Sequence, residues 1–206
     1  MLLRHGETEY TRDRRFSGSG GADPALSDTG RAQAAAAAEL LARLPQRWPV
    51  DAVVASPVRR ARETADVAAR ALGVEVREVD GLRECAFGEW DGHTLAEVQE
   101  RWPAELDAWL GSTSVAPPGG ESYDAVWQRV RRARDQLLTR YARQTVLVVS
   151  HVTPVKVLVG LGLGASTSAL FRMELKPASF SEIEWYAGGA TCLRLFNDTG
   201  HLSGVA

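Results

Sequence analysis

The chain has 206 residues, of which 45% are hydrophobic and 24% are charged. This length and apolar content suit one compact domain with a sizeable core. The net charge of -2 excludes a protein that binds nucleic acid through a broadly basic surface. Only two cysteines are present, with no CxxC pair, no secretory signal and no apolar run long enough for a membrane span. We therefore expect a protein of the reducing cytoplasm with neither a disulfide framework nor a membrane partner.

The chain begins with a short apolar run that ends in a cation, an imidazole and a glycine. Residues 1–3 are apolar and are followed by Arg4, His5 and Gly6. Such a run is typical of a buried parallel strand, and ligands of open α/β sheets bind beyond the carboxyl ends of these strands. We expect Arg4 and His5 to face a crevice. Because strands are usually longer, we also expect that the sequence is a piece of a longer polypeptide with an N-terminal partner domain.

The next stretch predicts a loop, a helix and a second buried strand. Small residues and glycines fill the loop 17–22, and Ser27 is a candidate cap for a helix from Ala32 to Leu44 that stops at Pro45. Residues 53–55 then form a strand of the same kind as the first. It is followed by a basic cluster that consists of Arg59, Arg60 and Arg62.

The basic cluster begins a second predicted helix. Ser56 and Pro57 suit its cap and first helical position, and Gly73 suits the residue just past its end. Apolar residues recur on one face of this helix, at Val58, Ala61, Ala65, Ala68 and Leu72. We therefore expect the helix to pack on the sheet with its positive N-terminus at the crevice.

The middle of the chain predicts a strand at 74–79 and then a loop at 82–92 that is dense in acids, aromatics and glycines. Thr94 and Glu97 match a capping box for a helix that reaches Trp102, and Pro103 starts another helix. Residues 111–120 contain two prolines and two glycines in succession, so they form a loop.

The last third predicts two helices, a strand and a hairpin. A long amphipathic helix covers 122–143 and leads into the strand 145–149, which ends at Ser150 and His151. A further helix opens at Thr153 and closes at three glycines, and the segments 180–186 and 191–196 form a terminal hairpin. Three strands thus deliver two imidazoles and arginines to one edge of a sheet, which indicates an anion site, and phosphate above all. The expected fold is a three-layer α/β/α sandwich with a mostly parallel central sheet.

These residue types suit phosphoryl transfer. A neutral histidine can attack phosphorus if cations surround the phosphoryl oxygens. Arg4, His151 and an arginine of the basic cluster are candidate cations, and Glu84 or Glu7 could protonate the leaving oxygen.

Each residue also has an ordinary structural interpretation. His5 could be a hydrogen-bonded core histidine, the basic cluster a solvated helix start and Glu84 a surface acid. Phe87 and Trp90 could belong to the core. We interpret His93 and His201 as structural, and no compact ligand spacing supports a metal site.

Four segments in order resemble the histidine phosphatase superfamily, in the branch with phosphoglycerate mutase-like enzymes. They are RHGET at 4–8, SPVRRARETA at 56–65, LRE at 82–84 and SH at 150–151. The resemblance implies that His5 is the phosphorylated nucleophile, that Arg4, Arg60 and His151 bind phosphate, and that Glu84 is the proton donor. It implies a phosphoglycerate mutase-like fold and no cofactor or metal.

Further phosphate-binding candidates from the resemblance are Thr11, Ser17, Gly18 and Val152. Thr11 is a departure, since the family often has an asparagine six positions after the histidine. The missing amide puts one phosphate contact in question, which Ser17 could replace.

The resemblance favours a metal-independent phosphatase over a mutase, because the segment 85–122 is short and acidic where mutases have a longer basic insertion. It is strongest to α-ribazole phosphatase-like enzymes and to the acid phosphatase domain fused behind ribonuclease H in some bacterial proteins. A small phosphorylated substrate and a fused ribonuclease H domain are thus the expected partners, without direct nucleic-acid binding by this domain. The alternatives are an α-ribazole phosphatase, a phosphoglycerate mutase, or a phosphate-binding or interaction module without turnover.

Overall fold

The computed structural model describes residues 1–43 and 49–205 and has the predicted layered architecture. In the described part, six strands form one sheet in the order β3-β2-β4-β1-β5-β6. Strands β1 to β4 pair in parallel, whereas β5 pairs antiparallel with β1 and with β6. The strand bounds are β1 Leu2–Arg4, β2 Ala52–Ala55, β3 Val76–Glu78, β4 Val146–Ser150, β5 Phe180–Trp185 and β6 Thr191–Asp198. The expectation of a mostly parallel sheet with a terminal hairpin is confirmed.

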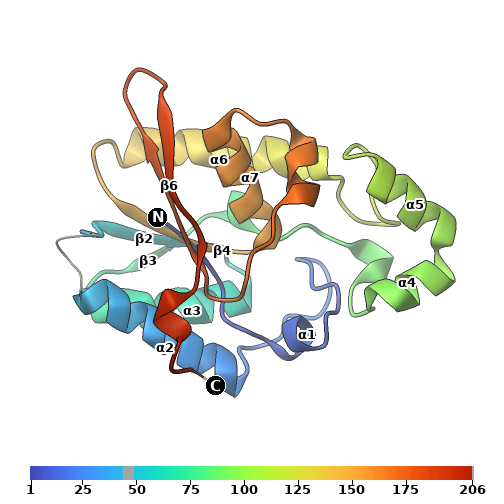
Figure 1. Cartoon of the computed structure of the whole chain (residues 1–206), viewed down its shortest axis with the longest axis horizontal. Coiled ribbons are helices and arrows are strands. Elements are labelled where there is room, and N and C mark those ends of the chain that lie inside the picture. The colour runs from blue at the N-terminus through green and yellow to red at the C-terminus, as the bar shows by residue number, and fades with distance from the viewer. Residues whose placement is uncertain (44–48, 206) are drawn as a thin grey trace.

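Helices cover both faces of this sheet, as Figure 1 shows. Helices α6 and α7 lie on one side, α2 and α3 lie on the other, and α4 and α5 lie apart from the sheet. The helix bounds are α1 Glu9–Arg12, α2 Asp28–Arg43, α3 Arg59–Leu72, α4 Leu95–Arg101, α5 Pro103–Gly111, α6 Tyr123–Arg140 and α7 Val152–Leu163. Short 3₁₀ turns cover Asp80–Leu82 (η1), Gly88–Trp90 (η2), Thr167–Arg172 (η3) and Gly200–Leu202 (η4). Within the described residues, no helix has the length and apolarity that a membrane span requires.

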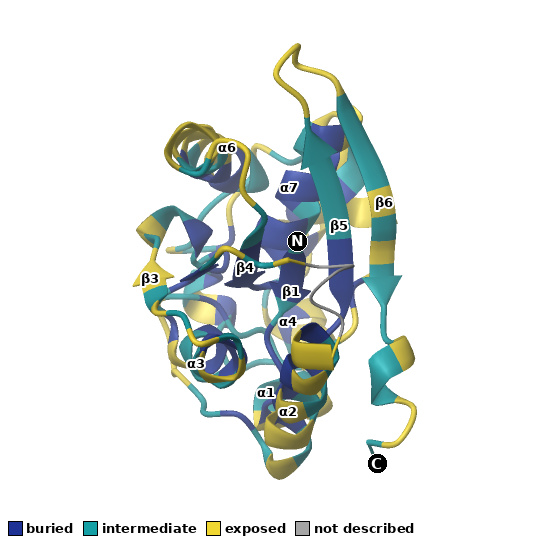
Figure 2. Cartoon of the chain, turned by 90° about the vertical axis from the view of Figure 1, so that its left-hand side faces the viewer, coloured by how far each residue is buried: buried dark blue, intermediate teal, exposed yellow. Residues whose placement is uncertain are grey.

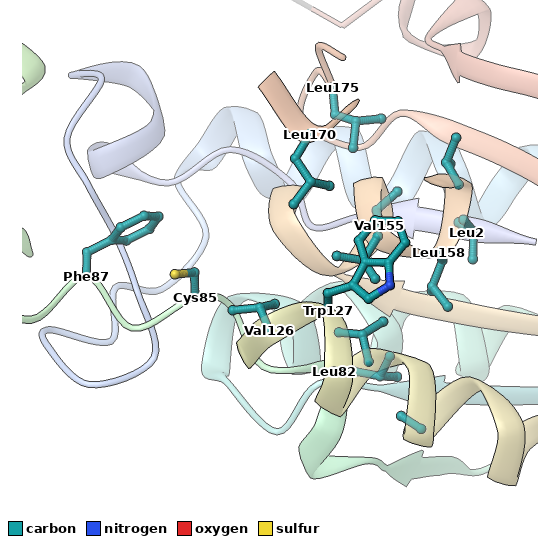
Figure 3. Packing of buried hydrophobic residues seen from close by; sticks show 14 of the residues in the cluster. Leu2, Leu82, Cys85, Phe87, Val126, Trp127, Val155, Leu158, Leu170 and Leu175 are labelled. Carbon is teal, nitrogen blue, oxygen red and sulfur yellow. The ribbon is translucent and has the colours of Figure 1, made fainter. Parts of the chain in front are cut away.

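The apolar strands are buried on both faces because successive side chains point to opposite sides of a sheet. Leu2 and Val148 pack in a cluster with residues of α6 and α7, whereas Leu3 and Val149 pack with residues of α2 and α3. Figure 2 shows β1 and β4 as the buried centre of the molecule, and Figure 3 shows Leu2 beside Val155 and Leu158 of α7. The continuous apolar runs therefore form two cores.

The register of the parallel strands brings the candidate residues to one edge. Arg4 is paired with Ser150 across β1 and β4, and Ala55 is paired with Val149 across β2 and β4. The chain beyond each strand stays in register, since the His5 N–H donates to the Ser150 carbonyl at 2.9 Å. The carboxyl edge of β1, β2 and β4 thus collects the residues that follow them.

The predicted start of the second helix is wrong by two residues. Val58 has extended backbone angles, with φ of -66° and ψ of 133°, so α3 begins at Arg59. Ser56 does not cap the helix, because its hydroxyl accepts the Val58 N–H and contacts His151. The Asp23 carboxylate, from a distant loop, accepts the first helical N–H at 3.1 Å.

Other boundaries differ by less. The expected end of the first helix at Leu44 and Pro45 lies outside the described residues. The strand expected at 74–79 is limited to β3, and the helix expected at 122–143 ends at Arg140, whose following turn includes Arg143 with a φ of 64°. Thr94 and Glu97 form the predicted capping box.

Candidate active site

His5 lies just beyond β1 and is almost completely buried, with 4% of its surface exposed. Its Nδ1 lies 2.7 Å from the Gly6 carbonyl, and its Nε2 lies 3.2 Å from Nε of Arg60. A carbonyl only accepts and a guanidinium only donates, so the proton is on Nδ1 and the lone pair is on Nε2. Burial first, and then the charges of Arg60 and Arg4, lower the pKa of His5 well below its usual value. His5 is therefore a neutral imidazole with its lone pair facing a cation.

Arg60, not Arg59, enters the site. The Arg60 side chain is 1% exposed, and its Nη2 donates to the carbonyls of Ser17 at 2.8 Å and Gly18 at 3.3 Å. Its buried Nη1 has no hydrogen-bond partner in the described part of the chain. The Arg59 side chain is 58% exposed and pairs with Glu63 on the helix surface. The open choice within the basic cluster is thus decided by the phase of α3.

Arg4 is the second cation at this edge. Its Nη1 donates to the Leu175 carbonyl at 2.6 Å. Its buried Nε has no hydrogen-bond partner among the described residues. Burial lowers the pKa of Arg4 to about 10; the charge of Glu84 opposes this shift and that of Arg60 adds to it. Arg4 therefore stays protonated at neutral pH.

His151 lies beside His5, with ring centroids 5.1 Å apart. Its Nε2 lies 2.8 Å from the Ser56 hydroxyl, and its buried Nδ1 has no partner among the described residues. Burial, followed by the charges of Arg60, Arg4 and Arg129, lowers the pKa of His151 well below its usual value. The expectation of a cationic His151 is therefore wrong for the free protein. His151 is a neutral hydrogen-bonding group, and the arginines supply the charge.

The loop at Ser17 and Gly18 lies against Arg60 of α3. The Ser17 hydroxyl is buried without a partner in the described chain. Gly18 must be glycine, because a Cβ there would lie 2.6 Å from the Cys85 carbonyl oxygen. Buried polar groups normally have partners. Unpaired polar atoms from Arg4, Arg60, His151 and Ser17 around one edge therefore indicate that the site binds a polar ligand.

Glu84 is the acid that lies at this edge. It is 5% exposed, and its Oε1 accepts from the N–H groups of Cys85 at 2.8 Å and Thr153 at 3.2 Å, the latter in the first turn of α7. Burial lowers the pKa values of Arg4 and Arg60, and the charge of Glu84 opposes this shift at both residues. The Glu7 carboxylate instead accepts the Ser27 hydroxyl at 2.9 Å, beside α2. The geometry favours Glu84 over Glu7.

Comparison with known proteins gives the family of the chain. The sequence model of the histidine phosphatase superfamily (branch 1) matches residues 1–198. The chain belongs to the histidine phosphatase superfamily. Its six-stranded sheet and flanking helices are the phosphoglycerate mutase-like α/β fold.

The relatives of the chain include several proteins that are named phosphatases. "Phosphoserine phosphatase 1" of Hydrogenobacter thermophilus is 34% identical, over 98% of this chain and 93% of the relative. The crystal structure of the alpha-ribazole phosphatase from Shigella flexneri has a TM-score of 0.84 at 26% identity, over 96% and 95% of the two chains. "Bifunctional protein Rv2228c" of Mycobacterium tuberculosis is 50% identical over 98% of this chain. The chain spans only 54% of that relative's length.

Two of the candidate phosphate-binding residues form no hydrogen bond with His5, Arg4, Arg60 or His151 in the described part of the chain. Thr11, in α1, places its hydroxyl 3.1 Å from the Thr8 hydroxyl, and its N–H donates to the same Thr8 oxygen. Val152 is the first residue of α7 and is half-buried. Both stay predictions from the resemblance.

Two residues beside the candidate site were not predicted from the sequence, and their side chains bind backbone groups of its loops. Thr64 accepts the Gly6 N–H at 3.1 Å and donates to the Arg60 carbonyl at 2.8 Å, which joins the His5 loop to α3. Asp91 accepts the Gly18 N–H at 2.5 Å. Thr64 lies within the motif at 56–65, one helical turn after Arg60, so the spacing contained a signal. For Asp91 no sequence signal exists.

Two further interpretations from the sequence concern the aromatic residues Phe87 and Trp90 and candidate metal ligands. Phe87 and Trp90 are buried and pack with Phe16 and Trp109, so they belong to the core as the structural interpretation expects. Within residues 1–43 and 49–205, no group of three or more His, Cys, Asp or Glu side chains is arranged to hold a metal ion.

Proposed function

We propose that this chain is a metal-independent phosphomonoesterase that acts through a phosphohistidine on Nε2 of His5. The observation that carries the proposal is the neutral, buried His5 whose Nε2 lone pair lies 3.2 Å from Nε of Arg60. A phosphoryl group there would lie among buried polar atoms that lack a hydrogen-bond partner in the described part of the chain: Nη1 of Arg60, Nε of Arg4 and Nδ1 of His151. Fixed donors at the place where charge develops lower the barrier for phosphoryl transfer.

The reaction would proceed in two balanced steps. Nε2 of His5 attacks phosphorus, the bond to the ester oxygen breaks, and the Glu84 carboxylic acid gives its proton to that oxygen. Water then attacks the phosphohistidine while the Glu84 carboxylate takes its proton, the P–N bond breaks, and inorganic phosphate leaves. Glu84 thus serves as acid and then as base, as one well-placed carboxyl can.

The test is hydrolysis of p-nitrophenyl phosphate in the presence of EDTA. Full activity with the chelator supports the proposal, and a quenched reaction should trap one acid-labile phosphate per chain. Replacement of His5 by alanine should abolish turnover and labelling, and wild-type-like activity in His5→Ala would falsify the mechanism. Phosphate binding without turnover in the wild-type chain would instead support a non-catalytic binding module.

We expect the substrate to be a small phosphate ester. Phosphatase-named relatives favour hydrolysis of a small phosphate ester, and the segment 85–122 contains seven acidic residues against one arginine, which disfavours a second phosphate site. A panel of phosphoserine, α-ribazole phosphate, phosphoglycerates and nucleotides would identify the leaving group. We expect hydrolysis without transfer between phosphoglycerate positions, and mutase turnover with bisphosphoglycerate would reverse that assignment.

We also propose that the domain belongs to a longer protein with a second domain of the ribonuclease H type. The support is the sequence resemblance, together with a relative that is named bifunctional and is about twice as long. Immunoblotting of the source cells with an antibody to this domain tests it. A single species near 22.3 kDa would contradict the proposal.

A further inference from the structure

The candidate acid lies in an irregular segment rather than on a strand or helix. Residues 81–86, here called the acid segment, run from the last two residues of η1 into the loop before η2. Loop residues lack the ladder of hydrogen bonds that fixes a strand, so another part of the molecule must hold Glu84 in place. That part is a half-buried pair formed by Arg129 of α6 and Glu121, which lies just before this helix.

Arg129 of α6 binds the backbone of the acid segment with most of its guanidinium. Nη1 donates to the carbonyls of Gly81 at 3.1 Å and Arg83 at 2.7 Å, and Nη2 donates to the carbonyl of Glu84 itself at 2.9 Å. The remaining bonds, from Nε and Nη2, go to the two oxygens of Glu121, each at 2.9 Å. A guanidinium has five donors in a fixed planar fork, and here every one has an acceptor.

Glu121 binds the other end of the same segment. Its Oε2 accepts the Ala86 N–H at 3.1 Å, and its own N–H donates to the Ala86 carbonyl at 2.8 Å. Burial raises the pKa of Glu121, but the hydrogen bond and charge of Arg129 and the Ala86 N–H outweigh it, so the pKa is lowered. Glu121 is thus a carboxylate, and the pair holds the segment both before and after Glu84.

Packing agrees with this arrangement. A Cβ at Gly81 would lie 2.8 Å from the Ala133 Cβ, so the acid segment lies directly on α6. The Ser150 hydroxyl donates to the Leu82 carbonyl at 2.7 Å, which ties the segment to β4 beside His151. Figure 3 shows Leu82 among the buried residues next to Trp127 of α6. The Arg129 side chain is 17% exposed, so water competes weakly for its bonds.

We propose that Arg129 and Glu121 are positioning residues, which fix the acid segment and so hold the Glu84 carboxyl where it protonates the leaving oxygen. This inference rests on the proposed phosphatase function. All the hydrogen bonds of the Arg129 side chain go to Glu121 or to backbone carbonyls of the acid segment. Loss of the pair should therefore impair proton donation and leave phosphate binding intact.

The decisive experiment compares leaving groups in Arg129→Met. For an alkyl phosphate, whose leaving oxygen needs a proton, kcat/KM should fall by about 10-fold to 100-fold, within the range of general acid catalysis. For p-nitrophenyl phosphate, whose leaving group needs little protonation, kcat/KM should change less than about threefold, because kcat/KM does not include the later hydrolysis of the phosphohistidine. The inhibition constant of inorganic phosphate should stay within about twofold of wild type. The control is Arg132→Met, which removes an exposed arginine of the same helix and should change neither substrate.

A double-mutant cycle with Glu84→Gln separates this role from a structural one. If Arg129 acts through Glu84, Arg129→Met should cause no further loss of alkyl phosphatase activity in the Glu84→Gln background. Additive losses, or equal losses with both substrates in the single variant, would overturn the inference. Glu121→Gln and Arg129→Lys test the same selectivity with smaller changes if Arg129→Met does not fold. A wild-type chain that hydrolyses neither ester would contradict the proposed function itself.

Discussion

At the scale of the residue, adjacent arginines have opposite roles. Arg60 and Arg59 have the same charge, but one is buried against His5 and the other pairs with Glu63 at the surface. An exposed pair of that kind contributes little to stability. Of these two arginines, only Arg60 should therefore affect the phosphate chemistry.

We expect Arg60→Ala to lower kcat with p-nitrophenyl phosphate by about 100-fold to 1000-fold, the usual loss for a donor that stabilises transition-state charge. Arg59→Ala should stay within about threefold of wild type, since its side chain points away from the site. Steady-state kinetics on both variants check this. Equal losses would mean that α3 presents a different face to the pocket.

The lowered pKa of His5 should also determine the pH dependence of kcat/KM. His5 must be neutral to attack, and burial with two nearby arginines keeps it neutral below the usual histidine pKa of about 6.5. The acidic limb of kcat/KM, calculated per concentration of ester dianion, should therefore lie below pH ~6.5. A limb at or above that value would show that the nucleophile is less buried than the structure has it.

At the scale of the element, the loop after β1 approaches α2 through two glycines. A Cβ on Gly30 would lie 2.0 Å from the Glu7 carbonyl oxygen, and a Cβ on Gly6 would lie 2.4 Å from the Gly30 carbonyl oxygen. Both clashes involve backbone, which cannot move aside as a flexible side chain can. The contact fixes the height of the His5 loop above the sheet.

Replacement of Gly30 by alanine should therefore lower the free energy of unfolding by about 1 to 3 kcal/mol, the range for overpacking, and should lower activity because it displaces the His5 loop. Gly111→Ala is the matched control, since Gly111 is also helical and a Cβ there meets nothing within 4 Å. Urea denaturation of both variants measures the difference. An unchanged free energy of unfolding in Gly30→Ala would contradict the close contact between Gly30 and the Glu7 carbonyl.

At the scale of the whole molecule, the site imposes a cost on stability in acid. Burial and neighbouring charges lower the pKa values of His5 and His151, so the unfolded chain takes up protons that the folded chain does not. Above pH ~6.5 both histidines are neutral in the folded and in the unfolded chain, so their burial adds no proton-linked cost. Below that pH the unfolded chain binds more protons, and the free energy of unfolding decreases.

The free energy of unfolding should thus decrease by about 1 kcal/mol per histidine for one pH unit below ~6.5. Urea denaturation at a series of pH values from neutral to mildly acidic measures this slope. His151→Asn should reduce the slope because it removes one titrating group, whereas an unchanged slope in that variant would assign the acid sensitivity to other residues.

The sequence by itself determined the layers, the parallel centre of the sheet and the family. The continuous apolar runs before Arg4, Ser56 and His151 have the composition of strands buried on both faces. This local pattern also places the residues that follow at one sheet edge. The resemblance added the assignment of Arg60, which spacing alone left open. The start of α3 was predicted wrongly because Ser56 hydrogen-bonds His151, a contact that no local pattern contains.

Tertiary structure decided the protonation of the site and the support of its acid. His151 is neutral because burial and nearby arginines from other elements act on it together, and pKa shifts depend on distances in space. Glu84 is held by Arg129, which is 45 residues away in the chain, through bonds to backbone carbonyls. Every residue has such a carbonyl, so the identity of the acceptors leaves no trace in the sequence. Only the folded chain selects which of these carbonyls Arg129 binds.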